Sequence, residues 1–290
     1  MTRPRRSVLF MPGSNSRALK KARDLPTDGL IFDLEDAVSP DAKVAARFEV
    51  SQSVAAGGFG RREVLVRTNG LDTPWGQEDL EMVAKVRPDG IVLPKVSRQD
   101  DLAAIVSRLA DLGATRDLSL WAMIETPLAV LNVQQIANQA RDASIGLVGL
   151  IIGPNDIARE TRLRQVAGRL PMLPALTHCI FVARAFGLDV LDGVYNNFTD
   201  LDGFAKECTQ SRDLGFDGKT LIHPSQIDLC NAAFTPTSDE VAHARDILRA
   251  FALPENALKG AIQIGGQMVE RLHTEMAERV VAIADAIGLG

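Results

Sequence analysis

Long apolar runs, paired cysteines and basic clusters are all scarce in this 290-residue chain, and each scarcity excludes a class of protein. No run approaches the roughly 20 apolar residues that a membrane-spanning helix needs. The apolar run that follows Arg3, Arg5 and Arg6 ends at Pro12, which makes it too short for a secretory signal peptide. A formal net charge of −5, with no basic stripe interleaved with aromatics, argues against nucleic-acid binding.

The cysteines and histidines form neither a disulfide framework nor a zinc site. The cysteines make an odd, widely spaced set: Cys179, Cys208 and Cys230. The histidines, which show no zinc-ligand spacing, are His178, His223, His243 and His273. We therefore expect a reduced, cytoplasmic protein. The remaining composition, 46% hydrophobic and 24% charged, is that of an ordinary globular enzyme-sized chain.

Short apolar runs typical of buried strands alternate with helical segments along most of the chain. The expected strands are Ser7–Met11, Leu30–Leu34, Val64–Arg67, Gly90–Leu93, Leu118–Ile124, Leu147–Ile152, Leu188–Leu191 and Gly218–Ile222. The expected helices between them are Ser16–Arg23, Asp41–Ala56, Gln77–Val86, Asp100–Leu112, Leu128–Gln139, Leu173–Phe186 and Asp200–Leu214. This alternation predicts an α/β fold, the (β/α)8 or TIM barrel. A doubly wound open sheet is the rival, but Met11–Asn15 is a weak substitute for its glycine-rich phosphate loop.

The pattern changes beyond Pro224. Residues 1–234 are expected to form the catalytic barrel, with Ser225–Phe234 as its last helix. Residues 235–290 are expected to be a helical extension with helices at Glu240–Phe251 and Met268–Ile287, separated by the glycine-containing stretch Gly260–Gly266. This extension is too short for an independent core, so we expect it to pack on a barrel, most simply that of a neighbouring subunit.

The stretch Gly29–Asp36 runs from apolar residues into three closely spaced carboxylates. Such carboxylates repel one another unless a cation or an arginine lies nearby. We therefore expect Glu35 and Asp36 to stand at the mouth of a site that holds positive charge. The alternative is an acidic helix start, because Ala37–Pro40 follows.

Charged residues follow most of the expected strands, at the barrel end where these folds place their active sites. Magnesium takes oxygen ligands, commonly one or two carboxylates with water and substrate. Glu125 and Asp156, after neighbouring strands, are the best pair for such an ion, and Glu35 and Asp36 would hold its water ligands. Glu125 would alternatively cap the helix that starts at Pro127.

Two basic residues end apolar strands. The planar guanidinium of Arg67 suits a substrate carboxylate or an enolate oxygen, although an ion pair with Glu35 is an equal alternative. Lys95 is expected to balance charge, with a Schiff-base role as the less favoured alternative. Asp192 and His223 are expected to make structural hydrogen bonds.

Several motifs resemble the citrate lyase β-subunit-like family of acyl-CoA lyases, within the HpcH/HpaI aldolase superfamily. The motifs are Arg6–Gly13, Asp33–Val38, Lys43–Arg47, Val66–Asn69, Leu93–Lys95, Glu125–Thr126, Gly153–Asp156 and Gly215–Pro224. The resemblance covers nearly the whole chain and is most specific in the last of these motifs.

This resemblance implies a (β/α)8 enzyme that acts on acyl-CoA thioesters with Mg2+, or Mn2+ as the alternative ion, and that assembles as a trimer or hexamer. It implies that Glu125 and Asp156 bind the metal and that Arg67 binds the acyl end of the substrate beside Glu125. Glu35 and Asp36 would support the metal waters and the arginine. Arg17 and Lys21 would face the phosphates of CoA.

The implied reaction is retro-Claisen cleavage of a 3-hydroxy-dicarboxylic acyl-CoA of the malyl-CoA, citramalyl-CoA or methylmalyl-CoA type. Many relatives insert a C-terminal aspartate from a neighbouring subunit as acid or base, and this chain has Glu270 there. The surrounding Val269–His273 resembles a branch that includes malyl-CoA thioesterases, so hydrolysis of the same thioester is the alternative. We favour lyase activity, because lyases are the more numerous members of the family. An aldolase for free 2-oxo acids and a non-catalytic subunit are further alternatives.

Overall fold

The computed structural model describes residues 3–114 and 118–289, and within them eight parallel strands close into a barrel. Each strand pairs with the next in chain order, and β8 returns to β1 in parallel register, with Ser7 opposite Lys219. The strands are β1 (Ser7–Pro12), β2 (Gly29–Asp33), β3 (Glu63–Arg67), β4 (Gly90–Leu93), β5 (Ser119–Ile124), β6 (Leu147–Ile152), β7 (Asp189–Asp192) and β8 (Gly218–Leu221). The predicted (β/α)8 fold is confirmed, and closure through the β8–β1 pair excludes the open sheet.

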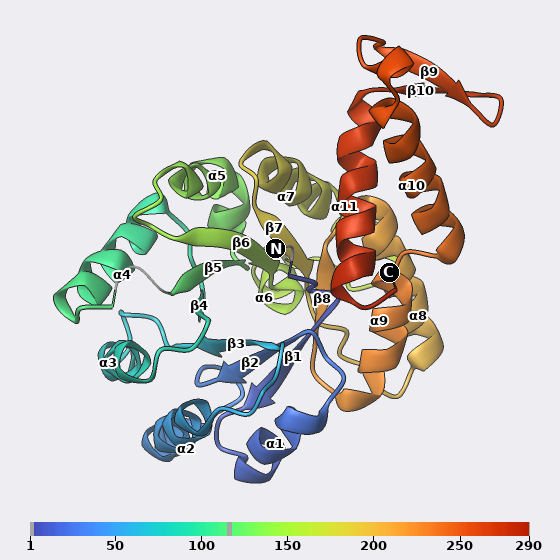
Figure 1. Ribbon diagram of the computed structural model, residues 1–290. Helices are drawn as coiled ribbons and strands as arrows, with labels where there is room; N and C mark the ends of the chain where they lie inside the picture. The colour runs from blue at the N-terminus through green and yellow to red at the C-terminus, as the bar shows by residue number, and fades with distance from the viewer. Residues whose placement is uncertain (1–2, 115–117, 290) are drawn as a thin grey trace. The chain divides into compact units, whose positions relative to one another are not determined.

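Helices follow the strands, and most of them surround the barrel on its outside (Figure 1). They are α1 (Ser16–Lys21), α2 (Lys43–Ala56), α3 (Gly76–Val86), α4 (Gln99–Asp111), α5 (Pro127–Asn138), α6 (Pro154–Thr161), α7 (Leu173–Ala185), α8 (Leu201–Leu214) and α9 (Ile227–Phe234). The short helix α6 was not predicted, because Gly153-Pro154 at its start has the composition of a loop. Pro154 occupies the first helical position, where its missing N–H costs no hydrogen bond.

Inward-facing side chains of the strands fill the barrel with an apolar cluster. The cluster consists of Val8, Ile31, Leu65, Val92, Trp121, Met123, Ile151 and Leu191, all buried. Because side chains alternate between the two faces of a strand, the residue two positions further along faces inward again. On β2 and β3 those next residues are Asp33 and Arg67, so the interior changes from apolar to charged at the carboxyl ends of the strands.

The chain divides into two compact units, one formed by Arg5–Ala233 and the other by the chain from Phe234 onward with the residues before Arg5. In the second unit α10 (Ser238–Ala252) and α11 (Leu272–Ala286) pack together. Their shared apolar cluster contains Ala244, Ile247, Phe251, Val269 and Ala277.

One expectation for the second unit is wrong. The segment from Met268 is not the start of the last helix, because β9 (Ala261–Ile264) and β10 (Gln267–Glu270) form an antiparallel hairpin. Gly265 and Gly266 make its two-residue turn with φ of 57° and 83°, which glycine adopts without steric cost. Glu270 is therefore the last residue of a strand, and α11 begins only after it.

Within residues 3–114 and 118–289, no helix combines the length and the apolar character required to cross a bilayer.

Candidate active site

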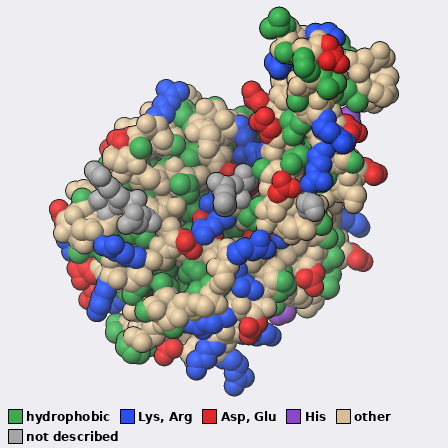
Figure 2. All heavy atoms as spheres, viewed as in Figure 1, with side chains coloured by type: hydrophobic (Ala, Val, Ile, Leu, Met, Phe, Trp, Pro, Cys, Tyr) green, Lys and Arg blue, Asp and Glu red, His purple; other side chains and the backbone are tan. Residues whose placement is uncertain are grey.

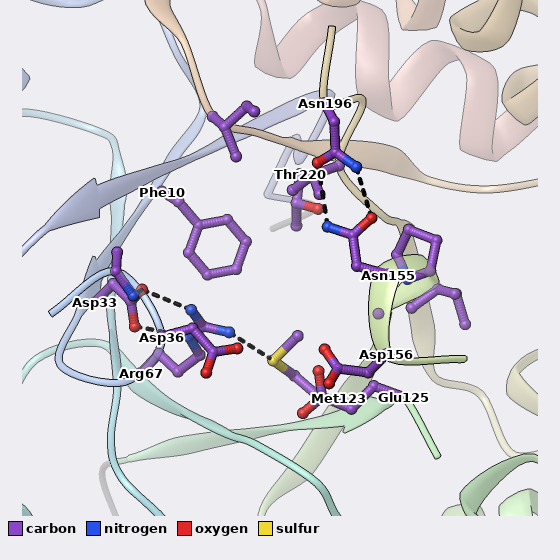
Figure 3. A pocket seen from close by; sticks show the side chains of 16 residues that line it. Phe10, Asp33, Asp36, Arg67, Met123, Glu125, Asn155, Asp156, Asn196 and Thr220 are labelled. Carbon is purple, nitrogen blue, oxygen red and sulfur yellow. Dashed lines mark hydrogen bonds and ion pairs between the residues drawn. The ribbon is translucent and has the colours of Figure 1, made fainter. Parts of the chain in front are cut away.

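Asp33 and Arg67 form a buried ion pair at the carboxyl end of the barrel. They are register partners on β2 and β3, which brings their side chains to the same level. Arg67 Nε donates to Asp33 Oδ1 at 2.7 Å and Nη2 donates to Oδ2 at 2.6 Å. This bidentate geometry fixes the plane of the guanidinium (Figure 3).

The remaining nitrogen of Arg67, Nη1, is directed to the other side of the guanidinium. It lies 3.1 Å from Glu35 Oε2 and 3.7 Å from the sulfur of Met123, while the guanidinium carbon lies 4.8 Å from the centre of the Phe10 ring. Burial acts to lower the pKa of Arg67, but the charges of Asp33 and Glu35 outweigh it and raise the pKa above its usual range. Arg67 therefore stays charged. Its main partner is Asp33, and the ion pair with Glu35 that the sequence suggested is present as well.

Glu35 is buried between two cations. Its Oε2 faces Arg67, and its Oε1 accepts a hydrogen bond from the Lys95 ammonium. Burial raises the pKa of Glu35 above its ordinary value, and the two cations oppose that rise. The loop that carries Glu35 is held by Lys43, whose Nζ donates to the carbonyl oxygens of Leu34 and Glu35 at 2.8 and 2.7 Å.

Glu125 is a buried carboxylate at the mouth of the barrel, only 1% exposed. It follows β5, and its Oε1 accepts a 2.6 Å hydrogen bond from the backbone N–H of Lys95. Burial raises the pKa of Glu125 to about 7, although the Lys95 N–H and the charge of Arg67 counteract it. Gly153 makes room for this carboxylate, since a Cβ at residue 153 would overlap Glu125 Cβ and lie 2.6 Å from Oε2.

Asp156 approaches Glu125 from the neighbouring element. It lies in the first turn of α6, where the helix dipole favours a negative charge, and its Oδ1 pairs with Arg159 Nη2 at 2.7 Å. Both carboxylates line the same cavity and point into it side by side (Figure 3). The charge of Asp156 is among the causes that raise the pKa of Glu125.

This donor set fits a hard divalent cation. In the described part of the chain, no group of three or more His, Cys, Asp or Glu side chains is arranged to bind a metal. Magnesium requires fewer protein ligands, because water and substrate oxygens complete its shell. Glu125 is buried, it has a raised pKa, and its neighbour Asp156 is also acidic, so a cation between them would offset an unfavourable concentration of negative charge.

The cavity has a volume of about 300 Å3, which is enough for a small organic acid but not for a whole coenzyme. Besides Arg67, Glu125 and Asp156, its wall includes Phe10, Asp33, Asp36, Met123, Gly153, Asn155, Asn196 and Thr220. Asp36 is mostly exposed at the mouth, with its Oδ1 3.9 Å from the Lys95 ammonium. Lys95 itself does not line the cavity, and its ammonium pairs with Glu35, which agrees with charge balance rather than a Schiff base.

Not all the expected site residues meet here. Arg17 and Lys21 are exposed on α1, where Figure 2 shows basic side chains gathered, but neither lines the cavity. Glu270 belongs to the second unit, so its role stays a prediction. Asp192 is buried in an ion-pair network with Lys219 and Arg169, which confirms a structural part for it.

The roles of Asp33, Gly153 and Lys43 were not predicted from the sequence. Asp33 was visible as the first acid after an apolar run, but only the register of β2 with β3 pairs it with Arg67. Gly153 and Lys43 lie within the motifs named above, but nothing in the neighbouring sequence singles them out.

The stacked rings of Phe198 and His223, whose centres are 4.7 Å apart, lie outside the cavity wall.

Fold and site together define a (β/α)8 enzyme with an acidic, arginine-containing centre at the carboxyl ends of its strands. Residues 6–224 match the family model of HpcH/HpaI aldolase/citrate lyase, and the chain belongs to this family of enzymes.

Named relatives extend the similarity over the whole length. The chain is 45% identical to a (3S)-malyl-CoA thioesterase of Cereibacter sphaeroides, over 98% of this chain and 96% of that protein. It is 34% identical to the citrate lyase subunit beta of Leuconostoc mesenteroides, over 98% of this chain and 94% of that protein. Among solved structures, CitE of Mycobacterium tuberculosis in complex with magnesium, acetoacetate and coenzyme A matches with a TM-score of 0.76 and 27% identity, covering 96% of this chain and 97% of that one.

Proposed function

We propose that this enzyme acts, with Mg2+, on the CoA thioester of a hydroxy dicarboxylic acid of the malyl-CoA type, and that it hydrolyses the thioester. The observation that carries the choice of hydrolysis is the 45% identity with the malyl-CoA thioesterase against 34% with the citrate lyase subunit. The sequence favours the lyase on family numbers, and the greater identity with the thioesterase supports the alternative.

The proposed metal site consists of Glu125 and Asp156, with the remaining positions open to water and to the substrate. A bound divalent ion would polarise a substrate oxygen and make a bound hydroxyl or water more acidic. The magnesium in the CitE structure supports this choice of ion, and Mn2+ would satisfy the same oxygen ligands.

The protein's own groups would orient the substrate and move the protons. Arg67, fixed by Asp33, presents Nη1 where it can bind a substrate oxygen and stabilise developing negative charge. Asp36, exposed at the cavity mouth, is placed to accept a proton from the attacking water. Addition of that water to the thioester carbonyl, loss of the C–S bond and protonation of the thiolate give malate and free CoA.

The lyase reaction is the second candidate, and the observation that favours it is the same rigid arginine beside the carboxylate pair. There a base would take the proton of the substrate hydroxyl, and the bond between the hydroxyl carbon and the α-carbon would break. The electron pair would pass to the thioester as an enolate, which Arg67 would stabilise before protonation. The products would be glyoxylate and acetyl-CoA.

Coenzyme binding and assembly are parts of the proposal that use other surfaces. The small cavity leaves the nucleotide outside, and the exposed basic residues Arg17 and Lys21 of α1 would bind its phosphates. Phe181 of α7, 70% exposed, and Leu131 of α5, 79% exposed, support self-association into a trimer or hexamer. In that assembly Glu270 would serve a neighbouring subunit's site.

The three cysteines, all in the described part of the chain, are unpaired and buried, which supports the proposal of a cytoplasmic location.

The deciding experiment incubates the enzyme with malyl-CoA and Mg2+ and measures glyoxylate, acetyl-CoA, malate and free CoA together. Malate with free CoA in equal amounts supports hydrolysis, whereas glyoxylate with acetyl-CoA identifies the lyase. Turnover of free malate or 2-oxo acids without CoA would contradict both.

A further inference from the structure

Lys95 contacts two different carboxylates of the site through two different parts of the residue. Its backbone N–H donates to Glu125 Oε1 at 2.6 Å, and its ammonium pairs with Glu35 Oε1. Glu125 follows β5, Glu35 follows β2, and Lys95 follows β4. One residue therefore links two acids whose charges both act on the Arg67 guanidinium.

The backbone conformation of Lys95 makes the double contact possible. Its φ is 53°, in the left-handed region that glycine usually occupies. Pro94 precedes it and offers no N–H, so the N–H of Lys95 is the first donor available beyond the end of β4. A turn with proline second and a left-handed residue third normally selects glycine at the third position. A lysine there is sterically unfavourable, and the ammonium contact with Glu35 gives a reason for it.

We propose that Lys95 is a positioning residue for the reaction: its N–H orients Glu125 toward the cavity, and its ammonium fixes Glu35 against Arg67. The inference rests on the proposed function, because Glu125 is there a metal ligand and Arg67 the substrate-binding group. The role of the Lys95 ammonium is then to orient Arg67 through Glu35, and it neither binds the metal ion nor reacts covalently with the substrate.

Two variants separate the contribution of the Lys95 ammonium from that of its backbone N–H. Lys95→Met keeps most of the side-chain length without the charge. Lys95→Gly also lacks the charge, keeps the N–H for Glu125 and adopts the left-handed φ without strain, so it protects against a failure to fold. Both are expected to lower kcat on malyl-CoA by about 10- to 100-fold with KM changed less than threefold, the range found for residues that orient a site.

Chemical rescue then tests whether the ammonium itself is responsible. Lys95→Cys, alkylated with 2-bromoethylamine, restores an ammonium on a chain of the same length. The reagent can reach residue 95, whose side chain in the native protein is 45% exposed, whereas Cys179, Cys208 and Cys230 are buried. We expect alkylation to return kcat to within about threefold of the native enzyme, with the native enzyme treated in parallel as the control.

Binding of Mn2+ to the metal-free proteins, measured by electron paramagnetic resonance, gives a readout that does not depend on turnover. The native protein and both variants are expected to bind the ion within threefold of one another or more tightly in the variants, because the N–H contact to Glu125 persists. A tenfold weakening, an unchanged kcat in either variant, or no recovery on alkylation would overturn the assignment. A native enzyme that neither binds Mn2+ nor turns over the thioester overturns the proposed function, and the assignment of Lys95 with it.

Discussion

Asp33 Oδ2 lies 2.6 Å from Arg67 Nη2, and the two residues stand opposite one another in the register of β2 and β3. The register of β2 with β3 thus brings the two side chains together. Their ion pair in turn determines where the third nitrogen of Arg67, Nη1, points. Both side chains are nearly inaccessible to solvent. Separating them would leave a buried charge without its partner.

Asp33→Asn is expected to lower both stability and activity. The amide cannot accept both hydrogen bonds of the guanidinium, so we expect a loss of about 3 kcal/mol in the free energy of unfolding. We expect kcat to fall about 100-fold, because Arg67 would lose its fixed orientation. Urea unfolding and steady-state kinetics measure the two effects.

Asp28→Asn provides the matched control for that variant. Asp28 also forms a bidentate pair, with Arg6 at 2.8 Å to each oxygen, but it precedes β2 at the opposite end of the barrel. The Asp28→Asn variant is expected to be less stable than the native enzyme but to keep its kcat. Equal loss of kcat in the two variants would show that Asp33 acts through stability alone.

Glu125→Gln and Asp156→Asn should each abolish the response of activity to Mg2+ while leaving the protein folded. Each keeps the shape of the side chain but removes a charged oxygen ligand, so weaker ion binding is the expected cause. Activity titrated with Mg2+ and circular dichroism test the two statements. Asp142→Asn, on an exposed turn, is the control. A fully active double variant would refute the metal assignment.

The stability of the metal-free enzyme should fall as pH rises from about 5 to 8. The pKa of Glu125 is about 7 in the folded protein because burial raises it from 4.5, so the folded state holds a proton that the unfolded state releases. The penalty for ionising Glu125 grows between these pKa values and is complete above the higher one. It amounts to about 3 kcal/mol at most.

Urea unfolding in the presence of a chelator, at pH 5.5 and at pH 8, measures this slope. Glu125→Gln should flatten it, because an amide does not titrate. Added Mg2+ should stabilise the native protein more at pH 8, where Glu125 is ionised and available to the ion. Identical slopes for the native protein and the variant would contradict the raised pKa.

Gly153→Ala is expected to disturb the site by adding one methyl group next to Glu125. The new methyl group would overlap Glu125, so either the carboxylate or the start of α6 must shift. We expect at least about tenfold weaker Mg2+ activation and a stability loss of about 1–3 kcal/mol. Gly260→Ala, where an added Cβ meets open space, should behave like the native protein.

Introducing a charge on an exposed apolar surface tests the proposed assembly. Phe181→Asp on α7 should shift the enzyme toward monomer in sedimentation velocity, because a carboxylate does not tolerate burial in a subunit contact. Glu160→Asp, a conservative change on another exposed helix, should leave the sedimentation coefficient unchanged. A native enzyme that sediments as a monomer would refute the proposal directly.

Much of the barrel could be predicted because buried parallel strands have a simple sequence pattern. Apolar runs such as Leu30–Phe32 are buried on both faces, and their polar ends mark where each strand leaves the core. The expected strands agree with the structure to within one or two residues. The hairpin of β9 and β10 escaped prediction because its strands are short and largely exposed, so burial imposes no strong pattern on them.

The sequence by itself determined the strand–helix alternation, the barrel and the acids and the arginine that end its strands, since these depend on local periodicity and on residue type. Only the tertiary structure decided that Arg67 takes Asp33 as its main partner, that Gly153 makes room for Glu125 and that Lys95 contacts two carboxylates at once. These relations join residues 28 or more positions apart, and they follow from strand register and backbone conformation, which no local pattern of residues records.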